Sequence, residues 1–345
     1  MTRKHCPLCT ERGTPNILPK NRTKMEKYDL MIIGAGAAGL TAGIYASRAK
    51  LNTVIINEGV VGGQMVLTEE VANYPGVETT KGYMLANTMK TQAKSFGCKI
   101  RSNVKITSYA LEGPVKSVTL EDGRSFSADA VILTPGGRPR SLNIPGEDLF
   151  KGTGISYCAT CDGDFFTGKE VIVVGGGNSA LEEAVALTNF ATKVTIVHQF
   201  DHFQAFEHAV KEAQDNPKIE FIMESELREF NGNTTLEKVT IEHLPTGNMS
   251  EMNIDGVFIF VGYLPNTESI TGLVTLNDRN EIVVDTDMKT SIPGVFAAGD
   301  CIAKKYRQVT TAVADGTIAA LSASEFLRNQ SVKSTPKPAT LHASD

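Results

Sequence analysis

The sequence reads Gly34-Ala35-Gly36-Ala37-Ala38-Gly39 between an apolar run at 28–33 and an alanine-rich segment at 40–49, and a further apolar run follows at 53–57. This order predicts a buried strand, a tight turn, a helix and a second strand, which together form a βαβ unit. The first glycine permits the turn, the second lets the backbone approach a pyrophosphate, and the third allows close helix packing. We therefore predict a dinucleotide site, with these residues as its phosphate-binding part: Gly34, Gly36, Ala37, Ala38 and Gly39.

The pattern returns between residues 170 and 197 as an apolar run, the turn Gly175-Gly-Gly-Asn-Ser-Ala180, a helical segment at 181–190 and another apolar run. Two such units predict an α/β protein with two Rossmann-type dinucleotide-binding domains of the three-layer ββα kind. The apolar segment that ends in Gly299-Asp300 would complete the first sheet if the second unit is inserted into the first. A helix is expected after it, near 310–327.

Composition narrows the class of protein. The 345 residues suffice for two domains, and a net charge of −5 without a basic stripe argues against a nucleic-acid partner. No apolar run reaches the roughly 18 residues that span a bilayer, and the polar N-terminus lacks the apolar core of a secretory signal. We expect a cytoplasmic protein without membrane contact. A flexible N-terminal extension is expected at 1–25, and a disordered tail at 331–345.

Cysteine spacing points to redox chemistry. The six cysteines are Cys6, Cys9, Cys98, Cys158, Cys161 and Cys301. They are too sparse for a disulfide scaffold, so the two Cys-x-x-Cys pairs indicate redox or metal sites. Next to the second pair stands Asp162, which can supply or accept the proton that thiolate chemistry requires. A zinc site would need another pair close in sequence, and none is present, so we predict a redox pair at Cys158 and Cys161 and no metal.

Short motifs add a family resemblance over residues 27–328. They are Gly34–Gly39, Gly62-Gly-Gln-Met65, Glu70-Val-Ala-Asn-Tyr-Pro-Gly76, Cys158-Ala-Thr-Cys161-Asp162, Gly175–Ala180, Gly262-Tyr-Leu-Pro-Asn266, Gly299-Asp300 and Tyr306-Arg-Gln308. Together they resemble the low-molecular-weight thioredoxin reductases. The resemblance implies a homodimeric flavoprotein that passes electrons from FAD to the disulfide, and on to thioredoxin or a thioredoxin-like protein.

The resemblance also implies roles for single residues. Cys161 would face the flavin, Cys158 would exchange with the protein substrate, and Asp162 would be the acid/base. Further FAD-binding residues would be Gly62, Gly63, Gln64, Asn73, Gly299, Asp300, Arg307, Gln308 and Val309. At the end of the second strand, where an acid often binds the ribose, Asn57 is followed by Glu58, and the ribose partner stays open between them.

The domain limits follow from the same analogy. An FAD domain is expected at 26–140 and 269–330, with a second domain inserted at 141–268. The inserted domain carries the disulfide and rotates to present it alternately to flavin and to thioredoxin. The linker reads Thr134-Pro-Gly136 where the family commonly has Ala-Thr-Gly. Because proline fixes φ, we expect Pro135 to limit rotation at this hinge.

The second unit departs from NADPH-using relatives, which carry His-Arg-Arg and a further Arg after the second strand. Here residues 198–204 read His-Gln-Phe-Asp-His-Phe-Gln. A 2′-phosphate thereby loses charge-assisted hydrogen bonds of roughly 1.5–3 kcal/mol each. The turn nevertheless suits a pyrophosphate. The residues predicted for this site are Gly175, Gly177, Asn178, Ser179, Ala180, His198, Phe200 and Phe203.

Several electron donors stay open. A second FAD or another non-NADPH nucleotide ranks first, NADH next and NADPH last. Alternatively, ferredoxin or flavodoxin delivers electrons directly to the first flavin. A non-catalytic nucleotide sensor is a third class. Three hypotheses remain for Cys6 and Cys9. They are incidental residues of a leader, an electron-relaying dithiol, or half of a metal site.

Overall fold

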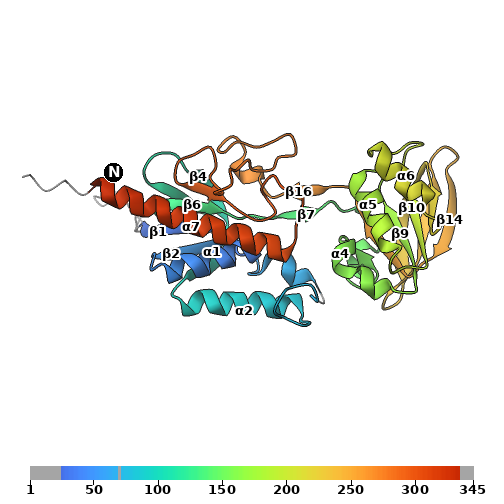
Figure 1. Ribbon diagram of the computed structural model, residues 1–345, viewed down its shortest axis with the longest axis horizontal. Helices are drawn as coiled ribbons and strands as arrows, with labels where there is room; N and C mark the ends of the chain where they lie inside the picture. Colours follow the sequence, from blue (N-terminus) through green and yellow to red (C-terminus); the bar gives the residue numbers. More distant parts are fainter. Residues whose placement is uncertain (1–24, 69–70, 335–345) are drawn as a thin grey trace, which may run out of the picture.

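The computed structural model describes residues 25–68 and 71–334. Its elements form two α/β bodies side by side along the long axis of the molecule (Figure 1). One body contains both Gly34 and the C-terminal helix, and the other contains the disulfide. The predicted extension up to residue 24 and the tail from 335 lie outside the described residues.

In the described part of the chain, seven strands form the sheet of the first body in the order β3-β2-β1-β6-β5-β4, with β17 paired to β6. They are β1 (Glu26–Ile33), β2 (Thr53–Asn57), β3 (Lys99–Ser102), β4 (Ile106–Ala110), β5 (Lys116–Leu120), β6 (Ser125–Leu133) and β17 (Val295–Ala297). The helical elements of this body are α1 (Ala37–Arg48), η1 (Gly63–Leu67), α2 (Gly82–Ser95), η3 (Glu268–Ile270) and α7 (Val309–Ser334).

The predicted βαβ unit is confirmed. β1 is parallel to both β2 and β6, and its two faces are buried in different clusters, with Leu30 and Ile32 on one side and Met31 and Ile33 on the other. Burial on both faces explains why the strand is apolar without alternation. α1 begins at Ala37, three residues earlier than predicted, so the alanines of the glycine turn form the first turn of this helix.

The C-terminal segment returns to the first sheet, as predicted. β17 pairs in parallel with β6, and α7 follows and packs against α1. The side chain of Phe296 fixes this return, because it is 1% exposed and its ring meets that of Phe326 on α7 edge-on at 6.2 Å. α7 extends to Ser334, beyond the predicted start of the tail at 331.

The second body has three layers. Its parallel sheet runs β11-β10-β9-β15-β8, and an antiparallel sheet runs β12-β13-β14. The elements are α3 (Glu147–Phe150), β8 (Ile155–Ser156), α4 (Ala159–Asp162), η2 (Gly163–Phe166), β9 (Glu170–Val174), α5 (Asn178–Leu187), β10 (Lys193–Val197), α6 (Glu207–Asp215), β11 (Ile219–Ile222), β12 (Ser225–Gly232), β13 (Leu236–His243), β14 (Asn248–Asn253) and β15 (Gly256–Ile259). On β9, Val171 and Val173 join a cluster with α5, whereas Ile172 and Val174 join one with the antiparallel sheet. The Rossmann-type fold predicted for both units is therefore confirmed.

A two-stranded antiparallel ribbon links the bodies. It consists of β7 (Gly137–Pro139) and β16 (Tyr263–Pro265), which are drawn between the bodies in Figure 1. Asn266 holds the adjoining turn, since its backbone N–H donates to Gly136 O and its side-chain amide donates to Pro135 O, both at 3.0 Å. Within the described ranges, no helix combines the length and apolarity that crossing a membrane requires.

We predict that Phe296→Ala destabilises the first body by about 3–5 kcal/mol, because it empties a fully buried site between the sheet and α7. Guanidinium denaturation followed by circular dichroism measures the loss. Val115→Ala, which truncates a side chain that is 47% exposed, is the control and should change stability by about 0.5 kcal/mol or less. Equal unfolding curves for the two variants would contradict the prediction.

Candidate active site

A cavity of about 1130 Å³ is lined by residues of both bodies. This volume lies slightly above the roughly 300–1,000 Å³ typical of small-molecule sites. It brings together the first glycine turn, the disulfide and the segment before α7. Of the residues predicted for the FAD site, those that line it are Gly34, Gly36, Ala37, Ala38, Asn57, Gly62, Gly63, Gln64, Asn73, Gly299, Asp300, Arg307, Gln308 and Val309. Gly39 and Glu58 do not line it.

The first glycine turn shows why each glycine is needed. Gly34 has φ +108°, and a Cβ there would lie 2.1 Å from Thr134 O. A Cβ on Gly39 would lie 2.0 Å from Gly34 O, so the third glycine serves helix packing. At Gly36 a Cβ would meet nothing within 4 Å, so this position faces open space at the start of α1. A helix N-terminus with free N–H groups beside open space suits a pyrophosphate.

The end of β2 supports this turn. Asn57 Oδ1 accepts a hydrogen bond of 2.9 Å from Ala35 N, and the residue also lines the cavity. The carboxylate of Glu58 instead accepts a hydrogen bond of 2.9 Å from Ile106 N at the start of β4. Ribose binding by Asn57 or Glu58 stays a prediction, and the geometry leaves Asn57 better placed for it.

Asp300 presents an unsatisfied group to the cavity. Its Oδ1 is buried and has no hydrogen-bond partner among the described residues. Burial raises the pKa of this carboxyl, while Lys304 and Arg307 act in the opposite direction. Lys304 Nζ lies 3.6 Å from this oxygen, beyond hydrogen-bond distance. Buried polar atoms are normally hydrogen-bonded, so an oxygen without a hydrogen bond suits a ligand rich in hydroxyl groups. The ribityl chain of FAD is such a ligand, and the residues present therefore fit FAD.

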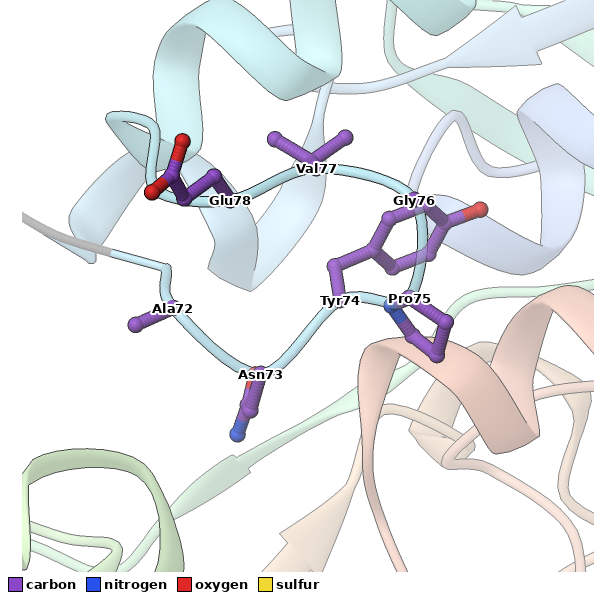
Figure 2. A pocket seen from close by; sticks show the side chains of 7 residues that line it. All are labelled: Ala72, Asn73, Tyr74, Pro75, Gly76, Val77 and Glu78. Carbon is purple, nitrogen blue, oxygen red and sulfur yellow. The ribbon is translucent and has the colours of Figure 1, made fainter.

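The loop between η1 and α2 contributes Thr68, Val71 and Asn73 to the cavity. Residues 72–78 enclose a smaller hollow of about 460 Å³. In Figure 2 the side chain of Asn73 points away from the ring of Tyr74 and from Val77. Of residues 72–78, Asn73 also lines the large cavity. It can thus present its amide to a ligand there.

The segment before α7 meets the disulfide. Gln308 Nε2 lies 3.8 Å from Cys158 Sγ and 4.0 Å from Cys161 Sγ. The guanidinium of Arg307 lies over the ring of Tyr263 at 4.5 Å and pairs with Glu281. The structure therefore brings the disulfide of the second body against the segment that the resemblance places over the flavin.

The disulfide sits at the start of a short helix. Cys158 and Cys161 are bonded, and the sulfur of Cys158, the N-cap residue of α4, accepts a hydrogen bond of 3.2 Å from Cys161 N. Asp162 ends this helix, and burial raises the pKa of its carboxyl. Sequence reasoning missed Ser156, whose hydroxyl lies 2.6 Å from Asp162 Oδ2. No spacing rule marked it, because the contact depends on how β8 and α4 meet.

The second glycine turn is partly covered by its own chain. His198 is 4% exposed, and its ring packs closely on Gly176. A Cβ added to Gly176 would lie 2.3 Å from this ring. Gln204 N donates to Gly176 O at 2.9 Å, and Phe206 N donates to Asn178 Oδ1 at 2.7 Å. The polar groups of the turn are thus partly used within the chain. Of the residues predicted for this site, Ser179 alone lines the large cavity.

The two phenylalanines predicted for the second site have different surroundings. Phe203 is partly buried and packs against the rings of His198 and Phe221, each at 5.7 Å. Phe200 is 42% exposed and stacks on His202 at 5.9 Å. The core thus accounts for Phe203, whereas Phe200 lies at the surface against the rings of His198 and His202.

The single cysteines are buried thiols. Burial raises the pKa of Cys98 to about 11 and that of Cys301 to about 12, so neither forms a reactive thiolate near neutral pH. Both residues belong to the apolar core of the first body. Cys6 and Cys9 lie outside the described residues.

Comparisons with known proteins agree with this site. The family model described as pyridine nucleotide-disulphide oxidoreductase matches residues 28–316. The chain is 44% identical over 307 residues to a thioredoxin reductase of Peptoclostridium acidaminophilum, which covers 87% of this chain and 97% of the relative.

Solved structures give the same result. The thioredoxin reductase of Streptococcus pyogenes MGAS5005 matches with a TM-score of 0.85 and 40% identity over 89% of this chain and all of that one. The thioredoxin reductase of Lactococcus lactis in the FR conformation matches with a TM-score of 0.61 and 39% identity, over 88% of this chain and 99% of that one.

These matches span both bodies, including the glycine turns and the disulfide. They confirm the family and the chemistry that the motifs predict, which is FAD-dependent thiol-disulfide exchange. The chain belongs to the pyridine nucleotide-disulphide oxidoreductases, and within them to the low-molecular-weight thioredoxin reductases.

Proposed function

We propose that this protein passes electrons from FAD at the first glycine turn to the Cys158–Cys161 disulfide, and on to thioredoxin or a thioredoxin-like protein. The observation that carries the proposal is the position of Gln308, whose amide lies within 4.0 Å of both sulfurs. Thioredoxin as the partner is supported by the relatives, which are named thioredoxin reductases. A homodimer is part of the proposal and rests on the family resemblance.

The residues divide the chemistry as follows. FAD, when bound, supplies the two electrons that open the disulfide. Two protons are taken up with these electrons, one by the Cys161 sulfur and one by the buried carboxyl of Asp162, so that Cys158 is left as a thiolate; both protons later pass to the partner's sulfurs. The Cys158 thiolate then attacks the partner's disulfide. Cys161 attacks the resulting mixed disulfide, so that the partner leaves as a dithiol and the Cys158–Cys161 bond forms again.

The partner's access to Cys158 requires a movement, because the disulfide faces the segment before α7. We place an FAD-binding domain at 26–140 and 269–330 and a rotating, disulfide-bearing domain at 141–268. The slender link through β7 and β16 supports a rotation there. The two structures named above support it too, since nearly equal identities accompany TM-scores of 0.85 and 0.61. Pro135, held by Asn266, would restrict where the chain turns.

We predict that Cys158→Ser abolishes thioredoxin reduction but leaves FAD bound, because the variant loses the exchanging sulfur and keeps the glycine turn. New thiols on oxidised thioredoxin are titrated after mixing with photoreduced enzyme. Cys98→Ser is the matched control, since Cys98 is buried away from the cavity, and it should keep the activity. Equal thiol yields from the wild type and Cys158→Ser would refute the proposed path.

For the second unit we propose a ligand without a 2′-phosphate. A second FAD or another non-NADPH nucleotide ranks first, which would make the protein a diflavin enzyme, and NADH ranks next. Three positions that carry arginine in NADPH-using relatives hold Gln199, Phe200 and Gln204, and all three are exposed. The open ring of Phe200 supports stacking of a flavin or adenine in place of a phosphate contact.

We predict that the triple variant Gln199→Arg, Phe200→Arg and Gln204→Arg raises kcat/KM for NADPH at least tenfold and leaves that for NADH nearly unchanged. Each charge-assisted hydrogen bond to the phosphate contributes about 1.5–3 kcal/mol. Steady-state reduction of thioredoxin measures both constants. Lysines at the same positions are the control, because they restore charge without the bidentate geometry. A wild type that already prefers NADPH would overturn the proposed donor order.

A second candidate donor is ferredoxin or flavodoxin, as an acidic carrier protein that reduces the first flavin directly. Three exposed lysines line the interdomain cavity, namely Lys151, Lys169 and Lys305. Each lies over an aromatic ring, and among the described residues none of them pairs with a carboxylate. Free positive charge on a protein of net charge −5 favours an acidic partner at this rim.

We predict that Lys151→Glu with Lys305→Glu slows flavin bleaching by reduced ferredoxin about tenfold or more at low salt, because steering by opposite charge is reversed. Stopped-flow absorbance measures the rate. The control pair is Lys50→Glu with Lys94→Glu, since both lysines are exposed and neither lines the cavity. Equal rates for the two pairs, or no bleaching of the wild type, would exclude this donor route.

A further inference from the structure

The hydroxyl of Ser156 contacts both the disulfide segment and the carboxyl beside it. Ser156 Oγ lies 2.6 Å from Asp162 Oδ2 and accepts a hydrogen bond of 3.1 Å from Cys158 N. It also lies 3.3 Å from Cys158 O. The residue is 5% exposed and ends β8, which pairs with β15 in the parallel sheet. A rigid strand thus holds this hydroxyl between Cys158 and Asp162.

We propose that Ser156 is a positioning residue of the thiol-disulfide reaction, which lets the Asp162 carboxyl gain and lose its proton without moving. The proposal rests on the role proposed above for Asp162. When the carboxyl is ionised, the single hydroxyl proton of Ser156 is donated to it. When the carboxyl is protonated, it donates to Ser156, and the serine proton turns to Cys158 O. A hydroxyl can serve both states because it donates and accepts.

Among the described groups around Asp162, the Ser156 hydroxyl is the one that lowers the pKa of its carboxyl. Burial raises the pKa of Asp162, the nearby charge of Asp164 raises it further, and the bond from Ser156 lowers it. Glu183 belongs to α5, which packs on α4; burial raises the pKa of its carboxyl too, while the backbone of Thr160 acts in the opposite direction. No lysine or arginine of the described residues forms an ion pair with Asp162. The Ser156 bond therefore stabilises the ionised form where no cation does.

Ser156, Cys158 and Asp162 all belong to the second body. A rotation of that body about the link of β7 and β16 leaves their mutual distances unchanged. The arrangement is therefore available both when the disulfide faces the first body and when it faces a partner. One hydroxyl can thus support proton uptake in one half-reaction and proton release in the other.

The test compares Ser156→Ala with the wild-type holoenzyme. Oxidised protein is mixed without oxygen with excess dithiothreitol, and flavin bleaching is followed by stopped flow between pH 5.5 and 9. Loss of the bond raises the pKa of Asp162, so the limb of the pH–rate profile that reports this carboxyl moves to higher pH. The rate at neutral pH falls about tenfold, as expected for a lost hydrogen bond to a charged group. Ser156→Thr keeps the hydroxyl and restores both.

Controls separate this role from a structural one. Ser225→Ala removes a buried hydroxyl that donates to Met223 O at 2.8 Å in another sheet of the same body, and should change neither rate nor profile. In an Asp162→Asn background, Ser156→Ala should have no further effect, because its partner carboxyl is gone. If Ser156→Ala does not retain FAD, the isosteric pair Ser156→Thr and Ser156→Val gives the same comparison.

The outcomes are distinguishable. A wild type whose flavin does not bleach, or bleaches equally in Cys161→Ser, refutes the proposed electron path itself. A wild type that bleaches through the disulfide, together with a Ser156→Ala profile that superimposes on it, refutes only the role of Ser156. A uniform loss of rate at every pH, without movement of the limb, also overturns it.

Discussion

The contact between the Gln308 amide and the two sulfurs of Cys158–Cys161 is the point on which the rest of the structure depends. The two participants come from different bodies, which a single two-stranded ribbon connects. In the function proposed above, electrons pass between a ring system at the first glycine turn and the disulfide while the bodies are in this orientation. Each body holds one participant in this contact in a fixed position. Its sheet, helices and glycine turn provide the support.

The chemistry at the contact follows from burial. Of the four cysteines in the described ranges, two form the disulfide, and burial keeps the thiols of Cys98 and Cys301 protonated. The same effect raises the pKa of Asp162, the carboxyl to which the proposed mechanism assigns a proton. Burial thus keeps two thiols of one body protonated and favours the protonated form of the carboxyl beside the disulfide in the other.

The second unit keeps its Rossmann-type fold, while residues 198–206 include no arginine. Its glycine turn is intact, and His198 and the loop up to Phe206 pack onto it through hydrogen bonds that the chain makes by itself. The positions that would hold a 2′-phosphate lie on the exposed part of that loop. Because these positions are exposed, exchanging them would change the charge of the surface and leave the core intact.

The sequence alone determined both Rossmann units, the return of the 290–300 segment to the first sheet, and the redox pair with its neighbouring acid. Apolar runs and glycine turns are local signals, since a strand buried on both faces and a helix N-terminus each require particular residues in a short stretch. Only the tertiary structure decided that Glu58 binds the backbone of β4, while Asp300 keeps an oxygen that has an ion-pair partner in Lys304 but no hydrogen bond. It also decided that Phe203 packs in the core while Phe200 lies at the surface, and that Ser156 contacts Asp162. These contacts join side chains on separate elements. A residue has several possible partners, and the spacing of residues along the chain does not show which of them packing brings within hydrogen-bond distance.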